Sequence, residues 1–137
     1  MRYMLDTNIC IYALKGHPDK LLEKLESLNY GDAVVSVITL AELRAGIEMN
    51  PATREQNDRA LHALLEDFPV LHFDEQAACH FGELRAAVRE RNRDSLDRLI
   101  AAHARSTSLT LITNNETDFR AYPGLSIENW AKDSTCN

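Results

Sequence analysis

The segment MRYMLDTN, residues 1–8, places a short apolar run directly before an acid and two further polar residues. Residues 3–5 have the composition of a buried strand, and Asp6 stands where that strand would end. Four further strand-like runs follow at residues 33–37 (AVVSV), 70–73 (VLHF), 109–112 (LTLI) and, more weakly, 125–127 (LSI). The opening segment is therefore the first of five strands expected in this chain.

Apolar residues with helical spacing lie between these runs. Leucines recur between residues 21 and 28 after Pro18, and similar patterns occupy residues 40–47, 61–68, 77–88 and 96–104. Strands separated by helices are typical of α/β proteins. We expect a three-layer sandwich with a central, mostly parallel sheet flanked by helices.

The length and composition are those of one ordinary domain. The chain has 137 residues, of which 45% are hydrophobic and 26% charged. We expect residues 1–131 to form the domain and residues 132–137 a loose tail. No apolar run approaches the roughly 20 residues of a membrane span, and an acid interrupts the stretch that a signal peptide would need. A cytoplasmic protein is expected.

The cysteines give no disulfide framework and no zinc motif. Cys10, Cys79 and Cys136 are odd in number and widely spaced. The apolar surroundings of Cys10 and Cys79 predict buried thiols, and a reducing compartment is the simplest environment for all three.

The net charge of -6 argues against binding nucleic acid through overall charge. Six of the 15 basic residues nevertheless fall in one short segment: Arg85, Arg89, Arg91, Arg93, Arg98 and Arg105. This segment is either a solvated helix face or a local basic edge that holds a phosphate backbone.

Acidic and amide residues gather where strands end. Asp6, Thr7 and Asn8 follow the first strand, Glu42 comes soon after the second, and TNNETD (residues 113–118) follows the fourth. The fifth helical segment opens with Asp94 and Asp97. Ligands of open parallel sheets bind beyond the carboxyl ends of the strands, so we expect these polar turns to lie together.

Each acid taken alone is also compatible with helix capping. Asp6 suits an N-cap, Thr39 and Glu42 fit a capping box, and residues 94–97 and 115–118 repeat that spacing. Several carboxylates at one sheet edge, however, repel each other unless a cation joins them. Oxygen ligands favour Mg²⁺ or Mn²⁺, and such an ion activates water for attack on a phosphodiester. Thr7, Asn8, Thr113 and Asn114 would orient ligands, water or phosphate oxygens.

Five motifs resemble those of a known family. MLDTNI, SVITLAEL, LDRLIAAHA, LTLITNNETDF and GLSIENW occur in this order between residue 1 and about residue 131. They resemble the PIN-domain toxins of bacterial toxin–antitoxin modules, the VapC type. The resemblance implies a Mg²⁺- or Mn²⁺-dependent endoribonuclease that cuts structured RNA such as a tRNA loop. It also implies a homodimer that a cognate VapB-like antitoxin holds inactive.

The resemblance assigns roles to individual residues. Asp6, Glu42, Asp97 and Asp118 match the family's four acidic positions, with Asp6 and Asp97 as metal ligands, and Thr7, Asn8, Thr113, Asn114 and Asn115 match its polar supporting positions. The chain departs from the family at residues 91–96, where a Gly-containing turn is usual and no Gly or Pro is present. Asp94 is therefore a possible substitute or helper for Asp97.

Other functions compete with this interpretation. A first-strand Asp also begins haloacid-dehalogenase-type phosphotransferases and receiver domains, but Asn8 replaces the former's second acid and the TNN turn lacks the latter's Lys. The alternative is a PIN domain altered before Asp97 that binds RNA or a partner without cutting. A nuclease acting on DNA would use the same metal chemistry, and only the resemblance favours RNA.

The acid-only site predicts hydrolysis by a metal-activated water, leaving a 5′-phosphate and a 3′-hydroxyl. No histidine is a strong candidate for a general base, because His103 lies on an apolar helical stretch and is expected to be a hydrogen-bonded core residue. Trp130 is expected to pack against the last strand rather than stack on a base.

Overall fold

The computed structural model describes residues 1–89 and 95–132. Five strands form one sheet: β1 (Tyr3–Leu5), β2 (Ala33–Ser36), β3 (Val70–Leu71), β4 (Thr110–Ile112) and β5 (Ile127–Glu128). The order across the sheet is β3-β2-β1-β4-β5, and every neighbouring pair is parallel. The strand that the opening segment predicted is thus the central one, and the expected parallel sheet is confirmed.

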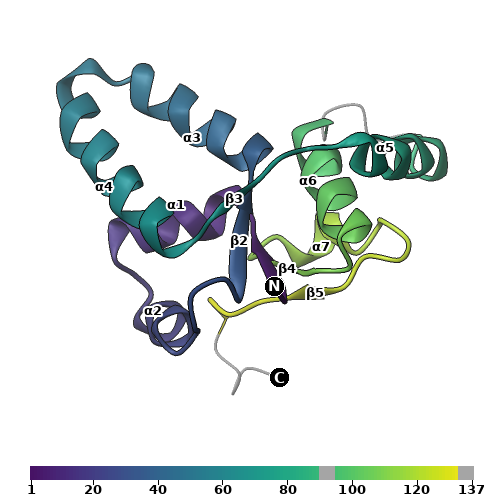
Figure 1. The fold of residues 1–137 in the computed structure, drawn as a ribbon, viewed down its shortest axis with the longest axis horizontal. Helices are drawn as coiled ribbons and strands as arrows, with labels where there is room; N and C mark the ends of the chain where they lie inside the picture. Colours follow the sequence, from purple (N-terminus) through teal and green to yellow (C-terminus); the bar gives the residue numbers. More distant parts are fainter. Residues whose placement is uncertain (90–94, 133–137) are drawn as a thin grey trace.

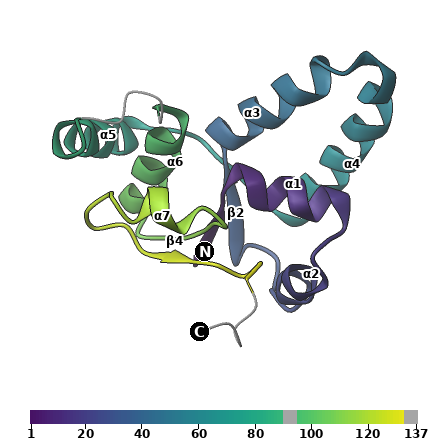
Figure 2. The same ribbon diagram turned by 180° about the vertical axis from the view of Figure 1, so that it is seen from behind.

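Helices cover both faces of the sheet, as Figures 1 and 2 show. The helices are α1 (Thr7–Lys15), α2 (Asp19–Glu26), α3 (Val37–Glu48), α4 (Arg54–Asp67), α5 (Glu75–Ala87), α6 (Ser95–Ser106) and α7 (Glu116–Phe119), with a 3₁₀ turn η1 at Pro51–Thr53.

Alternate residues of the central strand enter different cores. Leu5 packs with residues of α1 to α4, whereas Met4 packs with residues of α5, α6 and α7. This alternation is what a strand buried on both sides requires. The two cores confirm the predicted three-layer sandwich.

Helix α1 begins directly after β1 and was not predicted. Its first residues include β-branched Thr7 and Ile9, which obscure the helical pattern. The Asp6 side chain caps it by accepting a hydrogen bond from the N–H of Ile9. Gly16 ends it in the left-handed conformation, with φ of 79°, and donates to the carbonyls of Tyr12 and Ala13. Both caps are visible in the sequence as an Asp–Gly pair ten residues apart.

Helix α3 also begins where its strand ends, and this corrects the predicted capping box. Ser36, the last residue of β2, caps α3 through its Oγ, which accepts from the N–H of Ile38. Thr39 and Glu42 therefore lie inside the helix rather than at its start. Helix α3 leads away from the sheet and α4 returns, so the two form a projecting hairpin (Figure 1).

Two other expectations have different outcomes. Cys10 is buried as predicted, but Cys79 is exposed, because α5 turns this position towards solvent. The tail predicted for residues 132–137 lies outside the described residues except for Lys132. None of the helices in the described part of the chain is both long and apolar enough to cross a membrane.

Candidate active site

Asp6 lies at the carboxyl end of the central strand and is almost fully buried, with 3% of its surface exposed. One carboxylate oxygen accepts from the N–H of Ile9 at 2.9 Å, and the other accepts from Thr113 Oγ1 at 2.5 Å. The pKa of Asp6 is raised to about 6. Burial is the main cause and the nearby Glu42 carboxylate adds to it, while these hydrogen bonds partly oppose the shift. The two carboxylates thus interact unfavourably at neutral pH.

Glu42 reaches the same edge from the second turn of α3. Its Oε1 accepts a hydrogen bond from Thr7 Oγ1 at 2.7 Å, and Thr7 Oγ1 also lies 3.3 Å from Oγ1 of the buried Thr39. The first residue of α1 therefore holds the carboxylate that α3 presents. Thr7 immediately follows Asp6 in the chain, which explains why the two acids meet although 36 positions separate them.

The turn after β4 adds a second set of polar groups. Thr113 Oγ1, which donates to Asp6, accepts from the N–H of Asn115 at 2.9 Å. Asn115 Nδ2 in turn donates to Asp118 Oδ2 at 2.9 Å. Asp118 is thus connected to Asp6 through two intervening residues, Thr113 and Asn115. Asn8 is exposed on α1 and contributes its backbone N–H to Asp6.

Asn114 belongs to a neighbouring hydrogen-bond chain that the sequence did not reveal. Its Nδ2 donates to the hydroxyl of Tyr12 at 3.0 Å, and its Oδ1 accepts from Asn129 Nδ2 at 3.0 Å. Asn129 follows β5, and its Nδ2 also donates to Glu116. Asn129 is an amide directly after β5, and this position at the end of a strand is the sequence signal that points to it.

Asp97 is half-buried in the first turn of α6. Helix α6 precedes the parallel strand β4 and packs against both β2 and β4. A helix that connects parallel strands runs opposite to them, so its first turn lies at the carboxyl edge of the sheet. The structure therefore places Asp97 at the same edge as Asp6. Asp94, the possible helper, lies outside the described residues.

His103 holds α6 against this edge. It is buried, its Nδ1 lies 2.7 Å from Oγ of Ser36, and its ring bonds the backbone carbonyl of His72. Burial lowers the pKa of His103, which favours the neutral ring. The predicted core role of His103 is confirmed. Ser36, which caps α3 and bonds α6, was missed because it reads as one more residue of a buried strand.

Within the described residues, two members of the arginine segment do not support an open basic edge, which was one of its two interpretations. Arg98 is buried, with 2% of its surface exposed, and Arg105 pairs with Glu83 at 2.7 Å. The buried guanidinium of Arg98 donates to the carbonyl of Val88. Arg91 and Arg93 lie outside the described residues. Burial of Arg98 and the ion pair of Arg105 with Glu83 therefore remove two of the six cations from the surface that would contact RNA.

Comparison with known proteins agrees with this geometry. The PIN-domain family model matches residues 3–125, which is most of the chain. Ribonuclease VapC2 of Rickettsia felis is 38% identical over 96% of this chain and 100% of its own length. The chain is a PIN-domain protein of the VapC ribonuclease family. The tRNA(fMet)-specific endonuclease VapC of Shigella flexneri is 37% identical to this PIN domain over 96% of the chain and 99% of the relative.

Solved structures of VapBC complexes share the fold of this PIN domain. The DNA-bound VapBC of Salmonella typhimurium superimposes with a TM-score of 0.87 at 37% identity, covering 95% of this chain and 98% of the other. The VapBC2 of Rickettsia felis bound to a promoter DNA fragment gives 0.84 at 37% identity, covering 95% and 99%.

PIN-domain ribonucleases generally use a divalent metal ion, and the donor set at this edge fits one. Within residues 1–89 and 95–132, no three Asp, Glu, His or Cys side chains are grouped closely enough to hold an ion by themselves. Mg²⁺, however, commonly binds through one or two carboxylates and keeps several waters or phosphate oxygens. Buried Asp6, destabilised by its burial and by Glu42, is the carboxylate that a cation would relieve.

Proposed function

We propose that this PIN domain is a divalent-metal-dependent endoribonuclease toxin that cleaves structured RNA such as tRNA. The observation that carries the proposal is the desolvated carboxylate of Asp6 beside Glu42, at the carboxyl edge of a parallel sheet. The names of the VapC relatives support RNA, and in one case tRNA, as the substrate class. RNA in the cytoplasm is the corresponding cellular target.

Asp6 and Asp97 would hold Mg²⁺ or Mn²⁺. When bound, the ion supplies a Lewis acid that activates water and neutralises charge on the scissile phosphate. Thr113 keeps the Asp6 carboxylate oriented through its hydroxyl, and Thr7 does the same for Glu42. Glu42, held by Thr7 beside Asp6, is proposed to accept a proton from the attacking water. We expect the products to carry a 5′-phosphate and a 3′-hydroxyl.

The turn after β4 supports the same edge from the other side. Asn115 holds the carboxylate of Asp118, and Asn114 is fixed between Tyr12 and Asn129. These groups, together with exposed Asn8, are proposed to orient phosphate oxygens and water. Their hydrogen bonds restrict their rotamers before RNA arrives, which reduces the ordering that binding would require.

We further propose a VapB-like antitoxin as the inhibitory partner and a homodimer as the assembly. The VapBC complexes that share this fold support the antitoxin. An antitoxin that covers the carboxyl edge would exclude RNA and metal together.

The test is incubation of the purified chain with unfractionated tRNA, with and without Mg²⁺ or Mn²⁺, beside Asp6→Asn and the exposed-carboxylate control Glu48→Gln. We expect discrete, metal-dependent fragments with 5′-phosphate ends, and a loss on the order of 100-fold or more in Asp6→Asn alone. Intact RNA with folded, antitoxin-free protein would indicate a PIN domain that binds without cutting. A 2′,3′-cyclic phosphate would contradict hydrolysis by water.

A further inference from the structure

A surface hollow of about 520 Å³ lies between α2 and the segment that follows β5. Figures 1 and 2 both show this last segment of the described chain passing beside α2. Asn129, which bonds Asn114 at the carboxyl edge of the sheet, lines this hollow. Three lysines line it as well: Lys20, Lys24 and Lys132. None of these lysines belongs to the arginine segment that the sequence singled out, so they form a separate basic surface, here termed the lysine hollow.

The side chains of Lys20 and Lys24 and the backbone of Lys132 are held by specific contacts. Lys20 and Lys24 are one helical turn apart on α2, and Lys20 Nζ donates to the carbonyl of Lys132 at 3.2 Å. Lys24 Nζ lies 5.6 Å from the centre of the Trp130 ring, a cation–π contact. Trp130 itself is buried and meets the Tyr3 ring edge-on at 4.7 Å. The indole therefore positions a lysine and does not offer a free face for a base, as the sequence predicted for Trp130.

The charge of the hollow stands out on an acidic protein. Elsewhere, cations such as Arg44, Arg54 and Arg105 are matched to carboxylates. In the part of the chain that the structure describes, Lys24 pairs with the Trp130 ring and with no carboxylate. The lining also includes Glu23 and Glu128, and Glu128 accepts a hydrogen bond from the indole N–H at 3.0 Å. Three lysines against two carboxylates leave the hollow net positive.

The lysine hollow is continuous with the catalytic edge through Asn129. Its Nδ2 donates to Asn114, the residue after Thr113, and Thr113 donates to Asp6. Its Oδ1 accepts from the backbone N–H of Lys132 at 3.1 Å, which fixes the start of that residue. Asn129 thus connects the turn after β4, at the carboxyl edge of the sheet, with the backbone of Lys132.

We propose that Lys24 and Lys132, supported by Lys20, form a subsite for phosphate groups of the RNA that flank the cleaved bond. The inference rests on the proposed ribonuclease function and specifies how its substrate is held. Lysine binds phosphate as a point charge, so the subsite sets the register of the RNA and carries no base preference. The hollow borders Trp130, which packs on Tyr3 of β1, so the RNA strand would run from the Asp6 edge past Asn114 and Asn129 towards α2.

The experiment measures RNA binding separately from cleavage. Unfractionated tRNA is titrated in EDTA against an Asp6→Asn background that also carries Lys24→Met and Lys132→Met. Methionine keeps an unbranched apolar stem on Trp130 and a good helix former on α2. We expect about threefold to tenfold weaker binding for each lysine removed, and a salt slope, log K against log[salt], that is less steep by about 0.7 to 0.9 per lysine.

Three controls make the result specific. Lys24→Arg retains the charge and the ring contact and is expected to restore the parent slope, whereas Arg59→Met removes an exposed cation on the α3–α4 hairpin and is expected to leave it unchanged. A duplex DNA of similar length is titrated in parallel. An unchanged slope in the methionine variant, an equal change in Arg59→Met, or a change confined to DNA would overturn the subsite. If the parent protein neither binds nor cleaves tRNA, the proposed function fails instead.

Discussion

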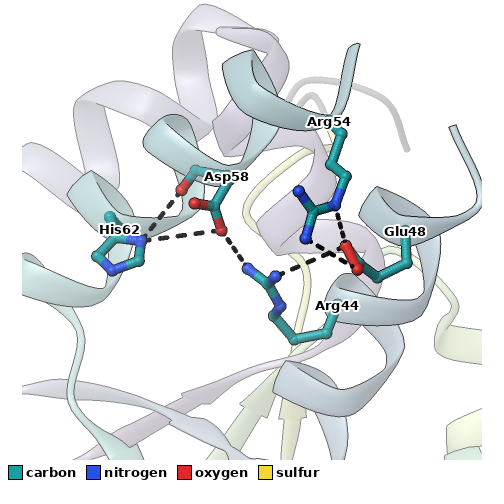
Figure 3. Close-up of polar contacts among 5 residues, drawn as sticks. All are labelled: Arg44, Glu48, Arg54, Asp58 and His62. Atoms are coloured by element: carbon teal, nitrogen blue, oxygen red, sulfur yellow. Dashed lines mark hydrogen bonds and ion pairs between the residues drawn. The ribbon is translucent and has the colours of Figure 1, made fainter. Parts of the chain in front are cut away.

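The carboxyl edge of the sheet and the α3–α4 hairpin both gather charged side chains, but they balance charge differently. On the hairpin, Arg44 bonds Asp58 and lies near Glu48, while Arg54 bonds Glu48 twice (Figure 3). His62 completes this network 4.0 Å from Asp58. At the sheet edge, by contrast, Asp6 and Glu42 face each other and are held by uncharged hydroxyls.

The pKa directions record this difference. Arg54 lowers the pKa of Glu48, and Arg44 lowers the pKa of Asp58, so both hairpin carboxyls are stabilised as anions. Burial instead raises the pKa of Asp6 to about 6. The hairpin carboxylates contact arginines, whereas the carboxylate of Asp6 accepts hydrogen bonds from a backbone N–H and from the hydroxyl of Thr113. This difference supports the proposed metal site at Asp6, because a buried carboxylate whose pKa is raised is the one that an added cation would stabilise most.

The largest effect on stability is expected from Asp6→Asn in metal-free buffer. The pKa of Asp6 is higher in the folded state, about 6, than the 3.8 of an exposed Asp, so its favourable contribution at low pH is lost as pH rises from about 4 to 6. Asparagine still caps α1 and does not ionise. The free energy of unfolding of Asp6→Asn minus that of the parent should increase by about 2.4 kcal/mol between pH 4 and pH 7.

Urea titrations in EDTA across this pH range provide the measurement. The lowered pKa values of Glu48 and Asp58 act in both proteins and cancel in the difference. Adding Mn²⁺ at pH 7 should restore the stability of the parent and leave Asp6→Asn unchanged. A difference in the free energy of unfolding that does not vary with pH would show that the pKa of Asp6 is not raised in the folded protein.

A smaller effect is expected where the edge is held together without charge. Ser36→Ala leaves the buried Nδ1 of His103 without its partner and removes the cap of α3. We expect a loss of about 1–3 kcal/mol in the free energy of unfolding, together with slower cleavage because α3 and α6 carry Glu42 and Asp97. Ser126→Ala, at an exposed position before β5, is the matched control. Equal stability of the two variants would argue against this connection.

The smallest effect is expected on the hairpin. Arg44→Met breaks the ion pairs to Asp58 and Glu48, but all three side chains are more than a third exposed. Exposed ion pairs contribute little and are screened by salt, so we expect the melting temperature to fall by less than about 2 °C and cleavage to persist. A shift much larger than this at 0.15 M salt would mean that the network supports the edge from a distance.

The sequence predicted the layered architecture well because strands buried on both faces are mostly apolar. Runs such as residues 33–37 and 109–112 contain one hydroxyl residue each among apolar ones, as strands covered on both faces commonly do. The helix at Thr7–Lys15 was missed because its first turn is rich in β-branched residues. Local spacing also misled at Thr39 and Glu42, where a plausible capping box lies inside a helix that Ser36 already caps.

The site was predicted only as far as strand ends determine it. Asp6 and Thr113 are placed by the ends of neighbouring parallel strands and are hydrogen-bonded, while Thr7, the residue after Asp6, bonds Glu42. Long-range partners such as Ser36 with His103 carry no local signal, since 67 positions separate them. Burial of Arg98 was equally invisible, because an arginine on a helix usually faces solvent.

The most direct test of the central claim is a Mn²⁺ titration at pH 7 followed by electron paramagnetic resonance of the free ion. It compares the parent with Asp6→Asn and with Glu48→Gln, which removes a carboxylate from the hairpin network. We expect saturable binding to the parent and to Glu48→Gln, and at least about tenfold weaker binding to Asp6→Asn. Equal Mn²⁺ binding by Asp6→Asn and the parent would contradict the assignment of the sheet edge as the metal centre.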